Sequence, residues 1–211
     1  MIAVITPPPS EANTWKNQLR LWVRTGTYSA GLVASTTTVG AIAGTIGSSL
    51  HVTTLNKAAN LYLWVAGTAI VALAYSMHEL GFIRLPVPQV PWQVPAQWLR
   101  YGAYGQALLY GLVLGADIFT FMPHATFYVL LLLEATLGLK GGATLGVIYG
   151  FARLTPTWAA ILYAHYGRRG CVPVTTWIAW ARKGLFHIAN GIALAIIGEV
   201  LIGLLLMVHF T

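Results

Sequence analysis

The chain has 211 residues, of which 57% are hydrophobic and 8% are charged, and its mean hydropathy is +0.69. Soluble domains carry about 25% charged residues, so this composition excludes an ordinary soluble domain. The formal net charge of +7 does not indicate nucleic-acid binding, because most Lys and Arg residues lie between apolar runs, where they orient a membrane protein and meet anionic lipid headgroups.

The apolar runs are continuous and about 20 residues long, which predicts an all-α polytopic membrane protein and excludes a transmembrane barrel. Residues 1–24 are predicted to form a cytoplasmic segment with an amphipathic surface helix. In that segment Trp15, Leu19 and Trp22 fall on one helical face, and Ser10 is placed to cap its start. The remaining residues, 25–211, are predicted to form a single transmembrane domain.

About five transmembrane helices are predicted in this domain, at about 28–50, 60–83, 101–139, 142–166 and 185–209. The third run is too long for one straight helix. Proline removes a backbone donor and breaks helices, so this run is predicted to be broken or re-entrant at Pro123 and His124.

The basic residues predict the orientation of these spans. If the third run makes one net crossing, nine Lys and Arg residues share one side, while Lys57 and Lys140 lie opposite and Arg153 lies within a span. Two crossings would divide them six against five. The positive-inside rule therefore favours one net crossing, with a cytoplasmic N-terminus and a C-terminus outside.

Three glycine pairs have the GxxxG spacing that lets helices approach closely: Gly40/Gly44, Gly111/Gly115 and Gly146/Gly150. Packing inside one chain is the favoured interpretation, and a dimer interface is the other.

Charged residues within predicted spans are candidates for function, because each costs several kcal/mol in lipid unless it is paired. They are Asp117, Glu134, Arg153 and Glu199, with Glu79 near a span end. Three interpretations apply to these residues: a buried ion pair of Arg153 with Glu134 or Asp117, a proton or cation pathway, and a charge that faces another subunit.

Two of the six histidines, His124 and His187, are candidate axial ligands for a haem or a chlorophyll-type pigment, which needs only one neutral imidazole. Hydrogen bonding to backbone groups freed by a helix break is the alternative role. No two histidines share a helical face at i, i+3 or i, i+4, so no protein-only metal site is predicted. The single cysteine, Cys171, excludes a disulfide or dithiol relay within the chain.

The stretch "LNKAANLYLWVAGTAIVALAYSMHELGFIRLP" (55–86) resembles the third span of CcdA-type cytochrome c biogenesis proteins and of the DsbD transmembrane domain. "FMPHAT" falls where that family has Pro-Cys, and "GVIYGFARLTP" (146–156) is similar to the pattern that follows. The resemblance implies a CcdA-like fold that lacks the family's first span. It also implies that His124 replaces one redox cysteine, and thiol exchange needs two sulfurs.

These observations predict a non-catalytic integral membrane subunit or assembly protein of a larger electron-transfer, haem or pigment complex in a prokaryotic inner membrane. Its expected partners are other membrane subunits and lipid, with no nucleic acid. The alternative is a non-redox transporter of a small cation, proton or metal, with its site at the broken third span.

Overall fold

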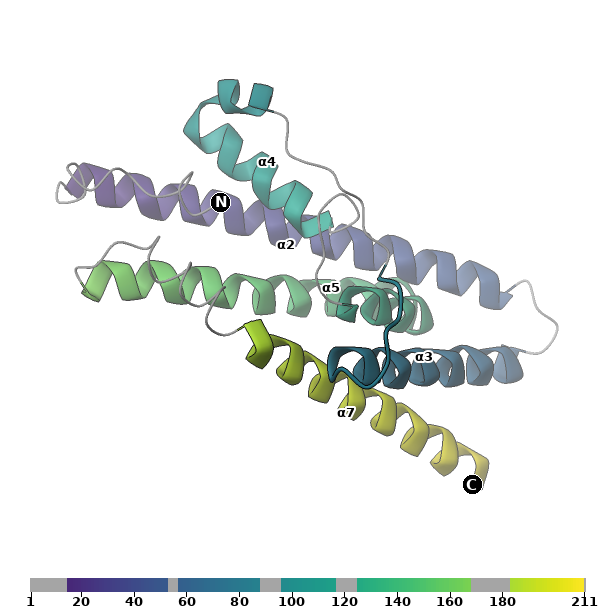
Figure 1. Cartoon of the computed structure of the whole chain (residues 1–211). Coiled ribbons are helices and arrows are strands. Elements are labelled where there is room, and N and C mark those ends of the chain that lie inside the picture. The colour runs from purple at the N-terminus through teal and green to yellow at the C-terminus, as the bar shows by residue number, and fades with distance from the viewer. Residues whose placement is uncertain (1–14, 53–56, 88–95, 117–124, 168–182, 211) are drawn as a thin grey trace. The chain divides into compact units, whose positions relative to one another are not determined.

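The computed structural model describes residues 15–52, 57–87, 96–116, 125–167 and 183–210, and in these ranges all regular structure is helical. The elements are α2 (Trp15–Val52), α3 (Lys57–Glu79), the short 3-10 helix η2 (Ala96–Tyr101), α4 (Gly102–Ala116), α5 (Thr126–Gly167) and α7 (Lys183–Phe210) (Figure 1). The predicted all-α class is therefore confirmed for the described part of the chain.

Four helices in the described ranges are long and apolar enough to cross a membrane, not the predicted five. Their apolar segments are Gln18–Leu50, Leu61–Glu79, Thr126–Leu162 and Gly184–Val208. The count falls because the predicted third span divides between two elements. Its first part is α4, which has only 15 residues, about 22 Å of helix against a hydrocarbon core of about 30 Å, and its last part, from Thr126, belongs to α5. The predicted break at Pro123 and His124 lies outside the described residues.

The first helix begins earlier than the predicted span. Trp15 to Val52 form one continuous helix, so the predicted surface helix is not a separate element. No proline interrupts it, and the hydroxyls of Thr25 and Ser29 donate to the carbonyl oxygens four residues earlier, at 2.9 and 2.8 Å. The Thr25 and Ser29 hydroxyls therefore satisfy their hydrogen bonds without ending the helix.

Helix α5 reverses direction at Gly138, whose φ of 72° and ψ of −177° are not helical. A Cβ placed on Gly142 would lie 3.2 Å from the carbonyl oxygen of Glu134. In a straight helix two residues eight positions apart are separated by about 12 Å. The helix therefore consists of a first arm, 126–137, and a second arm, 139–167, joined by a tight turn.

The chain divides into two compact units, and each draws on three separate stretches. Unit one is formed by Met1–Thr37, Val90–Phe121 and Gly146–Arg182, and unit two by Thr38–Gln89, Met122–Leu145 and Lys183–Thr211. This division leaves the single transmembrane domain as a prediction.

In unit one, α4 packs closely on α2. Gly111 lies against the backbone of Tyr28, and a Cβ on Gly115 would lie 2.5 Å from the carbonyl oxygen of Leu32. The rings of Trp22 and Trp158 stack with their centroids 5.8 Å apart. The core of this unit consists of Tyr28, Leu32, Ala107, Leu154 and Ile161.

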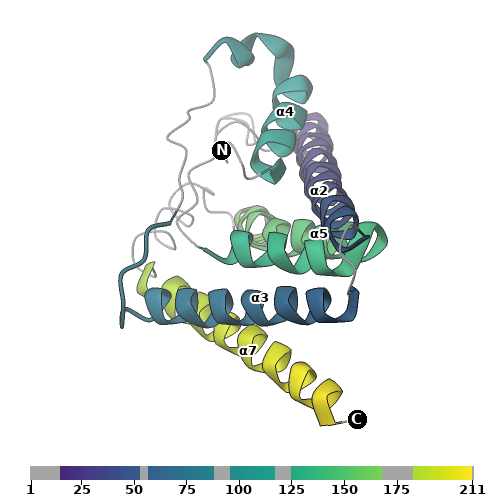
Figure 2. The ribbon, with the colours of Figure 1, turned by 90° about the vertical axis from the view of Figure 1, so that its right-hand side faces the viewer.

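In unit two, α7 lies along α3, and the first arm of α5 lies beside α3 (Figures 1 and 2). Ala72, Val129 and Leu194, one from each helix, form its buried core. The glycine pair Gly40/Gly44 of α2 lies against the backbone of Gly142 and Gly138.

The third pair, Gly146/Gly150, lies against Thr36 and Val33 in unit one. All three GxxxG pairs thus pack inside one chain, which confirms the favoured interpretation of these motifs.

Candidate functional site

A cluster of polar side chains lies in unit two, where α3 ends and where α5 and α7 begin. We refer to it as the Glu79 cluster. It consists of the side chains of Ser76, Glu79, Thr126, His187 and Asn190, together with the backbone N–H of Ala125.

The end of α3 places Glu79 in this cluster. Gly81 has a φ of +85°, which glycine adopts at little cost, and its N–H donates to the carbonyl oxygen of His78 at 3.0 Å. The N–H of Phe82 donates to the carbonyl oxygen of Met77 at 2.9 Å. These two bonds form a Schellman cap, which ends the helix one turn after Ser76 and leaves Glu79 facing inward.

The chain that leaves α3 is held against it by two further bonds. The N–H of Leu85 donates to Nδ1 of His78 at 2.9 Å, and the hydroxyl of Tyr75 donates to the carbonyl oxygen of Pro86 at 3.0 Å. His78 therefore has a structural role, which its position near a predicted span end did not reveal.

Glu79 joins three helices through its two carboxyl oxygens. Oε1 accepts a hydrogen bond from the backbone N–H of Ala125 at 3.3 Å, and Oε2 lies 2.6 Å from Nδ1 of His187. The side chain of Glu79 is 1% exposed and that of His187 is 33% exposed. Ala125 precedes the first turn of α5, where helix N–H groups lack partners and the helix dipole favours an anion.

Two further polar contacts complete the cluster. The hydroxyl of Thr126 donates to Oδ1 of Asn190, and the hydroxyl of Ser76 donates to the carbonyl oxygen of Gly191 at 2.7 Å. Nδ2 of Asn190 is buried and has no hydrogen-bond partner among the described residues. A buried donor left without a partner costs about 1–3 kcal/mol. The unpartnered Nδ2 of Asn190 therefore lowers the stability of the fold by about that amount.

This arrangement can fix one imidazole and bury one carboxylate. An ionised carboxylate only accepts hydrogen bonds, so with Glu79 ionised the proton of the pair is on Nδ1 of His187. A carboxylate in that place sets the tautomer and orientation of a histidine, as it does behind histidines that bind metals. In the ranges the structure describes, no group of three or more His, Cys, Asp or Glu residues could hold a metal ion.

The other predicted site residues lie apart from this cluster. Glu134 is buried, and its Oε2 has no hydrogen-bond partner within the described part of the chain. Arg153 donates from Nη1 to the carbonyl oxygen of Leu114 at 2.7 Å and lies over the ring of Tyr149 at 5.7 Å. Glu199 is exposed on α7. Four further residues lie outside the described ranges: Asp117, Pro123, His124 and Cys171. The roles predicted for these four residues, and for Glu134, Arg153 and Glu199, stay predictions.

Replacing Glu134 with methionine is expected to leave the melting temperature of the purified protein unchanged or to raise it. A buried carboxylate with an unpartnered oxygen is costly, and an apolar side chain of similar volume is often neutral or stabilising by about 1–4 kcal/mol. Thermal unfolding in detergent measures this effect. A clearly lower melting temperature would show that Glu134 has a stabilising partner, such as a bound cation.

Sequence reasoning did not find the partners of His187. Glu79 was noted only for its position near a span end, and Asn190 was not singled out. The available signal was local: a carboxylate two residues before a glycine, in the last turn of an apolar helix.

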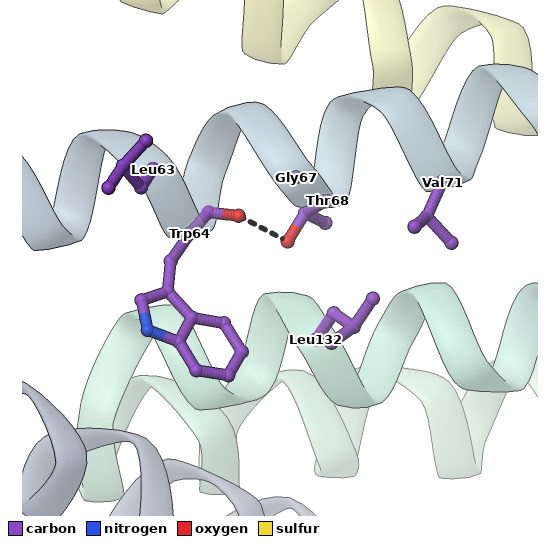
Figure 3. A pocket seen from close by; sticks show the side chains of 6 residues that line it. All are labelled: Leu63, Trp64, Gly67, Thr68, Val71 and Leu132. Atoms are coloured by element: carbon purple, nitrogen blue, oxygen red, sulfur yellow. Dashed lines mark hydrogen bonds between the residues drawn. The ribbon is translucent and has the colours of Figure 1, made fainter.

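An apolar groove of about 320 Å³ lies on α3 near the first arm of α5 (Figure 3). It is lined by Leu63, Trp64, Gly67, Thr68, Val71 and Leu132. Thr68 supplies the polar side-chain oxygen, and its hydroxyl already donates to the carbonyl oxygen of Trp64 at 2.8 Å. The groove therefore suits an apolar occupant, such as an acyl chain or an apolar side chain, better than a polar substrate.

Comparison with known proteins finds similarity to methylamine utilization protein MauF from three bacteria. The identity is 38% over 66 residues with the protein of Methylobacillus flagellatus, 31% over 96 residues with that of Methylophilus methylotrophus, and 33% over 103 residues with that of Paracoccus versutus. These matches cover 31%, 44% and 48% of this chain, but only 23%, 33% and 35% of the relatives' own length. No family model and no solved structure matches.

These matches overturn the resemblance to CcdA and DsbD. The similarity is to MauF proteins and not to the cytochrome c biogenesis family. The expectations that depended on that resemblance, a lost first span and a redox cysteine replaced by His124, are withdrawn with it. The shared features were mostly apolar residues with a few glycines and prolines, which recur in unrelated membrane helices.

Proposed function

We propose that this chain is a non-catalytic, integral membrane accessory protein that takes part in methylamine utilisation as a subunit or assembly factor. The observation that carries the proposal is the similarity to MauF, over as much as 48% of the chain. Those relatives are named for methylamine utilisation. That this chain takes part in the same process is our inference.

The architecture supports a membrane location and an accessory role. In the part of the chain that the structure describes, four helices are long and apolar enough to cross a bilayer. In the Glu79 cluster, the polar groups are directed at helix ends of the chain itself, as expected of groups that fix a fold. The hydroxyls of Ser76 and Thr126 donate to the carbonyl oxygen of Gly191 and to Asn190, as structural hydroxyls do. We therefore favour binding to other membrane proteins over catalysis.

We further propose a prokaryotic inner membrane as the location and an electron-transfer complex as the setting. A membrane protein that holds His187 in a fixed orientation suits docking near a haem group, although the partner protein would supply the redox chemistry. The alternative stays a non-redox transporter with its site at the broken third span, whose break at Pro123 and His124 lies outside the described residues. Among the described residues Glu134 favours this alternative, because its buried carboxylate has an unpartnered oxygen, and the methionine substitution described above tests it.

Deletion of the gene from a methylamine-using bacterium that encodes this chain is expected to abolish growth on methylamine and to leave growth on other substrates unchanged. The chain should remain in membranes washed with alkaline carbonate, because its apolar helices are held by the bilayer. Growth curves and membrane fractionation measure both results, with the intact gene reintroduced as the control. Normal growth of the deletion strain on methylamine would contradict the proposal.

A further inference from the structure

Helix α7 has a buried face and an outward face. On the buried side, a Cβ on Gly191 would lie 2.8 Å from Leu80, and one on Gly198 would lie 2.7 Å from Leu73, so both glycines press against α3. Leu194, between them, is fully buried. These three residues of α7, Gly191, Leu194 and Gly198, thus form the contact surface between α7 and α3 inside unit two.

The outward face holds a carboxylate in an apolar surface. We call it the Glu199 face, and it consists of Ile192, Ile196, Glu199, Gly203 and Leu206, which are spaced three or four residues apart. The isoleucines and Leu206 are about half exposed, and Glu199 is exposed as well. Nothing lies within 4 Å of a Cβ built on Gly203, one turn after Glu199. A second helix could therefore approach closely at this point.

Glu199 lies near the middle of the apolar segment Gly184–Val208. The central residue of that segment is Ile196, so Glu199 is only about 4–5 Å from the middle along the helix axis. This is the most apolar of the four candidate spans. A carboxylate at this depth costs several kcal/mol, and charged residues in membrane helices normally face the protein interior and are paired.

Within the described residues, the structure gives Glu199 neither an ion pair nor a hydrogen bond. Glu199 is exposed, and its helical position lies off the face of Gly191, Leu194 and Gly198 that packs on α3. A partner for Glu199 is therefore not supplied by α3. Hydrocarbon cannot pair with a carboxylate. The depth and exposure of Glu199 therefore favour a cationic or strongly donating group at the same level.

We propose that the Glu199 face docks a transmembrane helix of a different membrane protein, one that carries Lys or Arg at the depth of Glu199. Charge complementarity selects this occupant. A second copy of the same chain, packed through this face with two-fold symmetry, would bring Glu199 opposite Glu199, and like charges repel. The inference rests on the proposed membrane location and accessory role, and it adds the surface and the chemistry of the partner.

Photo-crosslinking tests this proposal in membranes of the native host. A photoreactive residue in place of Ile196 is expected to capture a transmembrane peptide that contains Lys or Arg within about one helical turn. The same residue in place of Leu204, which is exposed on another side of α7, is the matched control and should not capture that peptide.

Glu199→Leu is expected to reduce the yield of this crosslink at least about tenfold while the melting temperature of the purified chain stays unchanged. Glu199→Lys should abolish the crosslink, and exchanging the partner's basic residue for glutamate should restore it. Capture of lipid alone, of a second copy of this chain, or of an apolar segment without a basic residue would overturn the proposal. An undiminished crosslink from Glu199→Leu would overturn it as well.

Growth on methylamine separates this proposal from the proposed function. If the crosslink forms as expected but the deletion strain grows normally on methylamine, the docking face stands and the proposed function fails. If deletion abolishes growth but the crosslink is absent, the docking face fails and the proposed function stands.

Discussion

Replacing Gly47 with leucine is expected to prevent α2 from packing on α5 in unit two and to lower the melting temperature by about 2–12 °C. A Cβ on Gly47 would lie 2.5 Å from the carbonyl carbon of Ala135 and closer still to its oxygen. The obstacle is backbone and not a flexible side chain, so one helix would have to move. Overpacking costs about 1–3 kcal/mol or more, and each kcal/mol shifts the melting temperature of a chain of this size by about 2–4 °C.

Gly67→Ala is the matched control for this substitution. Gly67 also lies in the interior of a candidate span, but nothing lies within 4 Å of its added Cβ. Alanine is about 1 kcal/mol more favourable than glycine inside a helix, so this variant should melt at the same or a slightly higher temperature. Thermal unfolding in detergent compares the two. A Gly47→Leu protein that melts like the unchanged chain would show that the close helix contact does not exist.

Glu79→Ala is expected to destabilise the purified chain by at least about 2 kcal/mol. The substitution removes the acceptor for the Ala125 N–H and for Nδ1 of His187, and hydrogen bonds to a charged group contribute about 1.5–3 kcal/mol each. It also leaves the N–H of Ala125 buried without its partner. Helix ends from three elements would lose their common anchor.

A double-mutant cycle with His187→Ala measures the pair itself. We expect the two substitutions together to cost less than the sum of the single effects, because each removes the same contact. Glu199→Ala is the control carboxylate: it is exposed, and its loss should leave the stability of the isolated chain unchanged. Strict additivity of the Glu79 and His187 effects would contradict the hydrogen bond between them.

Sequence-based prediction was most accurate for helices that consist of one uninterrupted apolar run. The predicted spans 60–83 and 185–209 correspond to Lys57–Glu79 and Lys183–Phe210. The middle of the chain was harder, because Gly138, Gly141 and Gly142 lie close together in the sequence and each could form the turn of α5. Only the backbone angles identify Gly138, and not the Lys140-Gly141-Gly142 stretch, as the turn.

The Glu79 cluster could be predicted only in fragments. His187 stood out because a histidine in an apolar helix is conspicuous, but its partner lies 108 residues earlier in the chain, and the contact of Thr126 with Asn190 spans 64 residues. Periodicity reports which face of one helix is apolar, and it carries no information about which helix end meets another. Glu134 and Glu199 are both acidic residues in apolar runs, yet one is buried and the other exposed.

Each compact unit is assembled from three separate stretches, and both α2 and α5 contribute residues to both units. No single cut in the chain can therefore release one unit whole, and no single genetic crossover can exchange one for that of a relative. A truncation in the middle of the gene would damage both units at once. The chain is thus expected to diversify by point substitutions at its surfaces, while recombination of its parts would be selected against.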